Sequence, residues 1–202
     1  MSNSTSQNRA QVYWWLSSLI AAELDEKQLQ ILFSKDINTF LEALAEESEL
    51  SDAVSKLKQS IYGLRTREDV QLELAADYAK LFLGTGKQGA LPYASIYLSK
   101  DGLLMQEPHH QMVKLLHDNG FAQAEGFNEP ADHLAIILDF MGNLAVKDMK
   151  ASIQKHCLNE HLLSWLPRWQ KDAEKHDIFG FYAATALLIL EFIKMDSDFM
   201  QA

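Results

Sequence analysis

Residues 134–144 read Leu-Ala-Ile-Ile-Leu-Asp-Phe-Met-Gly-Asn-Leu, with apolar side chains at Leu134, Ile137, Leu138, Met141 and Leu144. This alternation of three- and four-residue steps lines up one apolar stripe along an α-helix. The same spacing recurs in residues 12–20 and 74–82, and no segment alternates in the way a strand does. The sequence therefore predicts an all-α fold, a helical bundle of about eight to ten helices.

Helix boundaries are marked by capping residues. Asp25 followed by Gln28 is the pattern of a capping box, and Asn119-Gly120 is typical of a helix end. Longer interruptions occur at residues 84–108 and 120–130, which are rich in glycine and proline. We expect a single all-α domain over residues 1–202, with an N-terminal half at about 9–119, a hinge at about 120–129 and a C-terminal half at about 130–202 packed against the first. The polar first eight residues are expected to be disordered.

Charge and cysteine content narrow the class of function. The formal net charge is −10, which disfavours nucleic acid as a partner and would attract a basic peptide, although acidic surfaces most often serve solubility. Cys157 is the single cysteine, so an internal disulfide is excluded and a reducing compartment, the cytoplasm, is expected. The uncharged run 178–190 is too short to cross a bilayer, so no membrane insertion is expected and the run predicts a buried core helix.

Gly84, Gly86 and Gly89 form a G-x-G-x-x-G pattern of the kind that binds dinucleotides. The pattern here follows a predicted helix, whereas dinucleotide sites need a preceding strand, and it leads to Pro92 instead of into a helix. We interpret the run as a flexible loop.

Histidines and carboxylates are the candidate metal ligands in this sequence. Glu129 and His133 lie four residues apart near a helix start, which makes a metal site conceivable, but no Glu-x-x-His partner motif occurs elsewhere. His156 and His161 are five apart on a helix and are therefore expected on different faces. A helical metal- or nucleotide-binding enzyme is the alternative that this reading leaves open.

Three segments carry a family resemblance: residues 92–97 (PYASIY), residues 129–134 (EPADHL) and residues 161–169 (HLLSWLPRW). From about Tyr78 onward the chain resembles the TorD family of cytosolic chaperones that mature molybdoenzymes. The resemblance implies an all-helical protein without enzymatic activity. It would bind the twin-arginine signal peptide and the apo form of a molybdoenzyme until the molybdenum cofactor is inserted and export is safe.

The long loop and the hinge are most similar to those of members that serve trimethylamine N-oxide reductase, so that enzyme is the expected client. The resemblance implies no cofactor of the chaperone's own, although family members bind GTP weakly. It also implies that a homodimer with exchanged halves can form.

A twin-arginine signal peptide has a basic head and an apolar body, so its receptor needs carboxylates beside apolar side chains. We expect the carboxylates to hold arginine, because a guanidinium group can be bound bidentately. The expected site comprises two carboxylates, two hydrogen-bonding side chains and three aromatic side chains: Glu129, Asp132, His133, Ser95, Tyr93, Tyr97 and Trp14.

Overall fold

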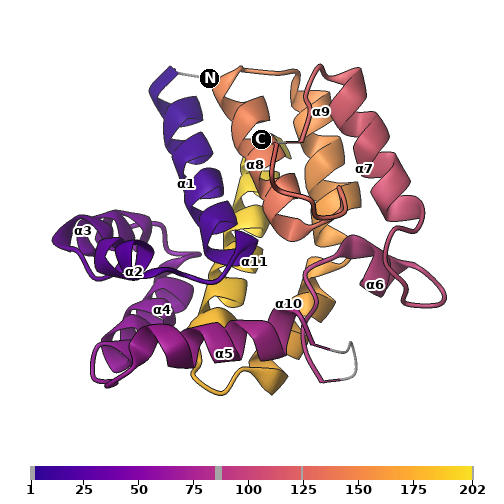
Figure 1. Ribbon diagram of the computed structural model, residues 1–202. Coiled ribbons are helices and arrows are strands. Elements are labelled where there is room, and N and C mark those ends of the chain that lie inside the picture. The colour runs from indigo at the N-terminus through magenta and orange to yellow at the C-terminus, as the bar shows by residue number, and fades with distance from the viewer. Residues whose placement is uncertain (1–2, 85–87, 124, 202) are drawn as a thin grey trace. The chain divides into compact units, whose positions relative to one another are not determined.

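The structure is a computed structural model that describes residues 3–84, 88–123 and 125–201. Within these residues it contains eleven α-helices and one π-helix and no strand (Figure 1). The all-α prediction is confirmed. The elements are α1 (Asn3–Ala21), α2 (Glu26–Leu32), α3 (Lys35–Leu44), α4 (Ser51–Leu64), α5 (Val70–Phe82), α6 (Ala94–Leu98), α7 (Glu107–Asp118), α8 (Leu134–Val146), α9 (Ala151–His156), η1 (Cys157–Leu163), α10 (Leu166–His176) and α11 (Phe181–Gln201).

The predicted caps are confirmed. The Asp25 carboxylate accepts the Gln28 amide at 2.8 Å, while the Gln28 side chain accepts the Asp25 amide at 2.9 Å, which closes the capping box of α2. Helix α7 ends at Asn119, and Gly120 follows with a φ of +73°, a conformation that glycine adopts without strain.

The expectation of a disordered N-terminus is wrong for residues 3–8, because α1 already begins at Asn3. Ser6 and Arg9 near the start of this helix are buried, whereas Gln7 and Asn8 between them are exposed. The Arg9 guanidinium donates to the side-chain oxygen of Gln154 in α9 at 3.0 Å. The polar composition of this segment therefore did not predict disorder correctly, because a buried polar side chain can be satisfied by a hydrogen bond within the fold.

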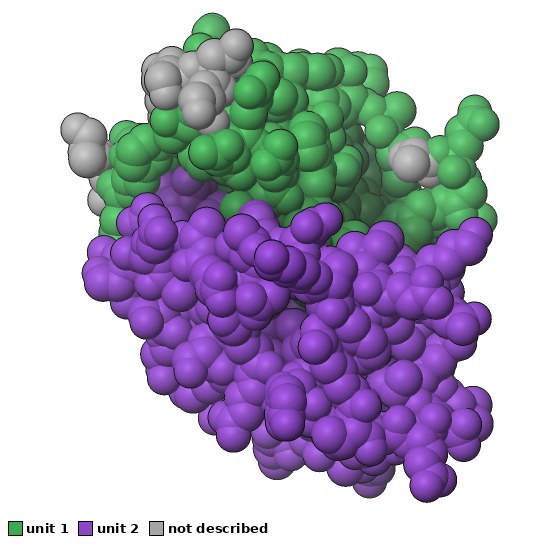
Figure 2. Space-filling model, turned by 90° about the vertical axis from the view of Figure 1, so that its left-hand side faces the viewer, with its two compact units in different colours: residues 1–21, 92–167, 197–202 green, residues 22–91, 168–196 purple. Residues whose placement is uncertain are grey.

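Two compact units make up the chain, and each is discontinuous in sequence (Figure 2). Unit 1 comprises residues 1–21, 92–167 and 197–202, and unit 2 comprises residues 22–91 and 168–196. The hinge predicted at residues 120–129 lies within the range of unit 1, and its role as a hinge stays a prediction. Among the described helices, none combines the length and the apolar character needed to cross a membrane.

The core of unit 1 is built on the packing of α1 against α8. Helix α8 is buried on almost every side, so its apolar stripe lies in the core as predicted. Gly142 makes room for the indole of Trp14, because a Cβ atom at this position would lie 2.6 Å from Trp14 Nε1. The hydroxyl of Ser17 donates to the Ala135 carbonyl at 2.8 Å, which satisfies a buried polar group between the two helices.

The core of unit 2 is aromatic. Tyr78 and Phe82 of α5 meet Tyr182 of α11 edge to face, with ring centroids 5.8 and 5.0 Å away, and Phe82 stacks on Trp169 of α10 at 6.2 Å. The indole N–H of Trp169 donates to the Ala90 carbonyl at 2.8 Å. This bond fixes the segment after α5 to α10 and leaves no buried indole donor unsatisfied.

Candidate functional site

Two segments of unit 1 that are far apart in sequence pair at the starts of α6 and α8. The Leu134 amide donates to the Pro92 carbonyl at 2.8 Å, and the Ala94 amide donates to the Asp132 carbonyl at 3.1 Å. Tyr93 and His133 thereby form an isolated antiparallel bridge. We call residues 92–95 together with 129–134 the corner.

Asp132 fastens the corner to α6. Its side chain is fully buried, and its Oδ2 atom accepts the Ser95 amide at 2.7 Å. Helix α6 receives no side-chain cap from its own N-cap residue, Tyr93, so Asp132 supplies the missing acceptor from the other segment. Its second oxygen, Oδ1, has no hydrogen bond and lies 3.9 Å from His109 Nδ1.

His133 caps α8 with its ring. The Nδ1 atom accepts the Ala135 amide at 3.1 Å, and the ring meets those of Tyr93 and Phe127 edge to face at 4.9 and 5.5 Å. Burial lowers the pKa of His133 to about 4. The ring is therefore neutral at pH 7 and keeps the lone pair that the cap requires.

Ser95 and Glu129 each make a further hydrogen bond at the corner. The buried hydroxyl of Ser95 accepts the Gln106 amide at 3.1 Å, which ties α6 to the start of α7. The half-buried carboxylate of Glu129 accepts the Tyr93 hydroxyl at 2.6 Å through Oε2. Of the polar side chains in the corner, the Glu129 carboxylate is the one that solvent reaches most readily.

The structure thus brings together five of the seven residues expected in the site. Tyr97 instead stacks on Trp165, with ring centroids 5.4 Å apart, and Trp14 packs against Gly142 with 36% of its surface exposed. The binding roles assigned to all seven residues stay predictions.

An apolar groove of about 330 Å³ adjoins the corner. Phe127 connects the two, because it lines the groove and contacts the ring of His133 in the corner. We call this cavity the unit 1 groove. Its lining comes from α1, from α8 and from residues 116–127: Ser17, Ala21, Leu116, Phe121, Ala122, Gln123, Phe127, Ala135, Ile136, Asp139, Phe140 and Asn143.

Sequence reasoning missed these lining residues, although one signal was present. Phe121 and Phe127 are the two large apolar residues of the stretch 120–130, which otherwise holds glycine, alanine, proline, glutamine, asparagine and glutamate. Isolated aromatic side chains in such a linker need a surface to cover. Gln123 secures the linker by donating to the Glu129 carbonyl at 2.8 Å. The linker is therefore fastened to the corner.

Asp139 places a carboxylate on the rim of the groove. Removal of its carboxyl group from water raises the pKa of Asp139, while a hydrogen bond of 3.0 Å from the Asn143 amide acts in the opposite direction. The groove therefore offers aromatic walls and the carboxylate of Asp139, while the Glu129 carboxylate belongs to the adjoining corner.

The prediction that His156 and His161 lie on different faces is wrong. Residues 157–163 form a π-helix, whose wider turn aligns side chains five residues apart, and the two rings meet with centroids 5.2 Å apart. Burial, and next the neighbouring His156, lower the pKa of His161 to about 4. Cys157, beside them, is fully buried, and burial raises the pKa of its thiol. Among the described residues, no group of three or more His, Cys, Asp or Glu could hold a metal ion.

The glycine run after α5 has a packing role at two of its positions. A Cβ atom at Gly84 would lie 2.6 Å from the Lys80 carbonyl oxygen, and one at Gly89 would lie 2.5 Å from that of Leu81. Gly86 lies outside the described residues. The run follows helix α5, as the sequence indicated, so the strand that a dinucleotide site needs does not precede it.

Comparison with known proteins gives consistent matches. The family model described as nitrate reductase delta subunit matches residues 40–171. The chain is 47% identical over 204 residues to the chaperone protein TorD of Aliivibrio fischeri, covering 96% of this chain and 95% of that protein. It is 44% identical over 208 residues to that of Aliivibrio salmonicida, with 98% and 97% covered, and 43% identical over 204 residues to that of Vibrio parahaemolyticus, with 96% and 95% covered.

A helical fold with these relatives defines the protein as a chaperone and not an enzyme, so the metal- or nucleotide-dependent enzyme is set aside. The chain belongs to the TorD family. The resemblance inferred from residues 92–97, 129–134 and 161–169 is confirmed.

Proposed function

We propose that the protein binds the twin-arginine signal peptide and the apo form of a molybdoenzyme, trimethylamine N-oxide reductase, in the cytoplasm. It would hold this client until the molybdenum cofactor has been inserted. Membership of a chaperone family and a net charge of −10 support a basic protein segment as the ligand. The observation that carries the proposal is an apolar groove that has the Asp139 carboxylate in its lining and adjoins the corner that holds Glu129.

In this proposal Glu129 receives an arginine of the peptide. Tyr93 occupies one lone-pair site of the carboxylate, and a carboxylate offers about four such sites, so a guanidinium can still bind. The apolar body of the peptide packs against the aromatic walls formed by Phe121, Phe127 and Phe140. Apolar contact supplies affinity, and the carboxylates select the basic head.

Asp132, His133 and Ser95 act in this proposal by positioning. Because Asp132 is fully buried, it would meet an arginine only if the corner opened. Its bond to the Ser95 amide and the cap that His133 supplies to α8 instead hold the segment that carries Glu129. The expected weak GTP binding and exchange of halves between protomers remain predictions that are independent of this site.

Glu129→Gln is expected to weaken binding of a twin-arginine signal peptide about tenfold, since a hydrogen bond to a charged group contributes about 1.5–3 kcal/mol. Phe127→Ala is expected to weaken it through loss of groove wall. Calorimetric titration measures the affinity of both variants for the peptide. Glu107→Gln is the control, because Glu107 is an exposed carboxylate of α7 in the same unit. If Glu129→Gln binds the peptide as wild type does, and a peptide with both arginines replaced by alanine binds equally, the proposed site is wrong.

A further inference from the structure

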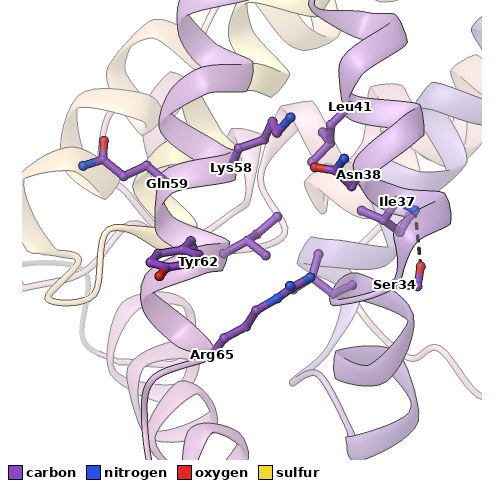
Figure 3. A pocket seen from close by; sticks show the side chains of 10 residues that line it. Ser34, Ile37, Asn38, Leu41, Lys58, Gln59, Tyr62 and Arg65 are labelled. Carbon is purple, nitrogen blue, oxygen red and sulfur yellow. Dashed lines mark hydrogen bonds between the residues drawn. The ribbon is translucent and has the colours of Figure 1, made fainter.

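A second cavity, of about 330 Å³, lies in unit 2 between α3 and α4, and Figure 3 views it from close by. We call it the α3–α4 groove. Its lining combines apolar side chains with polar or charged ones: Leu32, Ile37, Leu41 and Ile61 with Ser34, Asn38, Lys58, Gln59, Tyr62 and Arg65.

Both helices present the same spacing to this groove. Eight of the ten lining positions are 34, 37, 38 and 41 along one wall and 58, 61, 62 and 65 along the other, each a set of i, i+3, i+4 and i+7, and Leu32 and Gln59 complete the lining. Each helix therefore lines the groove with one continuous face over two turns, about 10 Å long. Two parallel stripes of this kind form the surface into which the apolar face of a third helix can be laid.

The groove is basic in a protein that is acidic as a whole. Lys58 and Arg65 both extend from α4 toward α3 (Figure 3). The ammonium of Lys58 is paired with Glu42 at 3.2 Å, but the two side chains are 35% and 58% exposed, and such surface pairs exchange partners at little cost. Among the described residues that line the groove, none carries a carboxylate.

Arg65 and Tyr62 have the character of interface residues. The Arg65 guanidinium lies over the ring of Phe33, 5.3 Å from its centroid, and donates to the Phe33 carbonyl, which leaves further N–H donors for a ligand. Tyr62 is 71% exposed. Tyrosine and arginine are enriched among the residues that dominate binding energy, so an exposed pair beside an apolar floor favours a protein ligand.

We propose that the α3–α4 groove binds an amphipathic helix of a partner protein, one whose contact face carries apolar side chains and carboxylates about seven residues apart. The apolar side chains cover Ile37 and Tyr62. One carboxylate replaces Glu42 on Lys58, and the other binds Arg65 bidentately. This ligand is opposite in charge to a twin-arginine signal peptide, so the proposal does not depend on the function proposed for the unit 1 groove.

The test uses a fluorescein-labelled synthetic helical peptide of about 18 residues, long enough to span the groove with flanking turns. Its apolar face carries leucines at three- and four-residue steps and two glutamates seven residues apart. A second peptide has lysine in place of both glutamates. Fluorescence anisotropy with the full chain is expected to show saturable binding of the glutamate peptide and at least about tenfold weaker binding of the lysine peptide.

Charge reversal separates recognition from a change in fold. Arg65→Glu is expected to weaken binding of the glutamate peptide about tenfold. The double variant K58E/R65E is expected to bind the lysine peptide more tightly than the glutamate peptide. Lys56→Glu is the matched control, because Lys56 lies on the same helix, pairs with Asp52 and does not line the groove. Circular dichroism of each variant checks the fold, and twin-arginine peptide binding is expected to be unchanged in all of them.

Three outcomes would overturn the proposal. The first is no saturable binding of the glutamate peptide up to millimolar protein. The second is a failure of the charge reversals. Either Lys56→Glu and Arg65→Glu lose affinity for the glutamate peptide equally, or K58E/R65E shows no preference for the lysine peptide. The third is a wild-type dimer, seen by light scattering, that Arg65→Glu dissociates, since the occupant would then be a second copy of this chain.

Discussion

Replacing Asp77 with asparagine is expected to increase the stability of the protein at pH 8 and to increase it much less at pH 5. Asp77 lies on α5 in unit 2 and is 3% exposed. Neither of its carboxyl oxygens makes a hydrogen bond of standard geometry. Its polar neighbours include the Asp177 carboxylate, the Ile178 amide, Lys80 and the Tyr182 hydroxyl.

Asp177 is committed to another task. Its carboxylate accepts the amides of Phe179, Gly180 and Ala183 at 2.8, 2.9 and 2.7 Å and so caps the start of α11. A second ionised carboxylate beside it is unfavourable. Burial, and next the neighbouring Asp177, therefore raise the pKa of Asp77 to about 7 from its usual 3.8. Below that pH, a protonated Asp77 can donate a hydrogen bond to Asp177.

The direction of the pH effect follows from proton linkage. Because the folded state holds this proton more tightly than the unfolded state, the stability contributed by Asp77 is complete below pH 3.8. It is lost as the pH rises toward 7. Asparagine is neutral at every pH and keeps a donor toward Asp177. The difference in unfolding free energy between Asp77→Asn and wild type should therefore grow by about 2 kcal/mol from pH 5 to pH 8.

Urea unfolding at both pH values measures this difference. The comparison with the variant is needed because His133 and His161 have lowered pKa values, which reduce stability as the pH falls from 6.5 toward 4. Asp69→Asn removes an exposed carboxylate at the start of the same helix and serves as the control. If the difference in unfolding free energy between Asp77→Asn and wild type stays constant between pH 5 and pH 8, Asp77 does not take up a proton in this range.

Helical periodicity was enough to predict the fold class, because burying one face of a helix requires the 3.6-residue repeat that α5 carries at Leu74, Tyr78 and Leu81. The same rule failed at His156 and His161. The repeat assumes α-helical geometry, and nothing in residues 157–163 announces a π-helix. Local geometry of this kind is set by how neighbouring elements pack, which the periodicity of one segment does not contain.

The candidate site was likewise predictable only in part. The sequence assigned the Glu-Pro-x-Asp-His segment and residues 92–95 to one site, and the structure does pair them in the corner, whose binding role stays a prediction. What the segment could not reveal is burial. Asp132 is fully enclosed while Glu129 is half-buried, and this difference arises because the Ser95 amide approaches from a segment 37 residues away. The groove walls at Phe121 and Phe127 were missed for the same reason.

Asp132→Ala is expected to destabilise the protein by about 3 kcal/mol, because it leaves the buried Ser95 amide without an acceptor and removes the cap that Asp132 supplies to α6. Asp132→Asn keeps an acceptor oxygen and should cost about 1 kcal/mol. Urea unfolding measures both changes. Hydrogen exchange should be faster at the amides of Ser95 and Gln106 in the alanine variant, since Ser95 passes the constraint on to α7. Unchanged exchange at both amides would contradict this role.

The same two variants decide how Asp132 takes part in binding. If Asp132 positions the corner, Asp132→Asn retains most of the affinity for a twin-arginine peptide, while Asp132→Ala loses it together with stability. If Asp132 instead receives an arginine directly, its charge is required, and both variants lose affinity alike. We expect the first result, because the Asp132 side chain is fully buried and its Oδ2 atom already accepts the Ser95 amide. Removing the negative charge should therefore weaken peptide binding at Glu129 and not at Asp132.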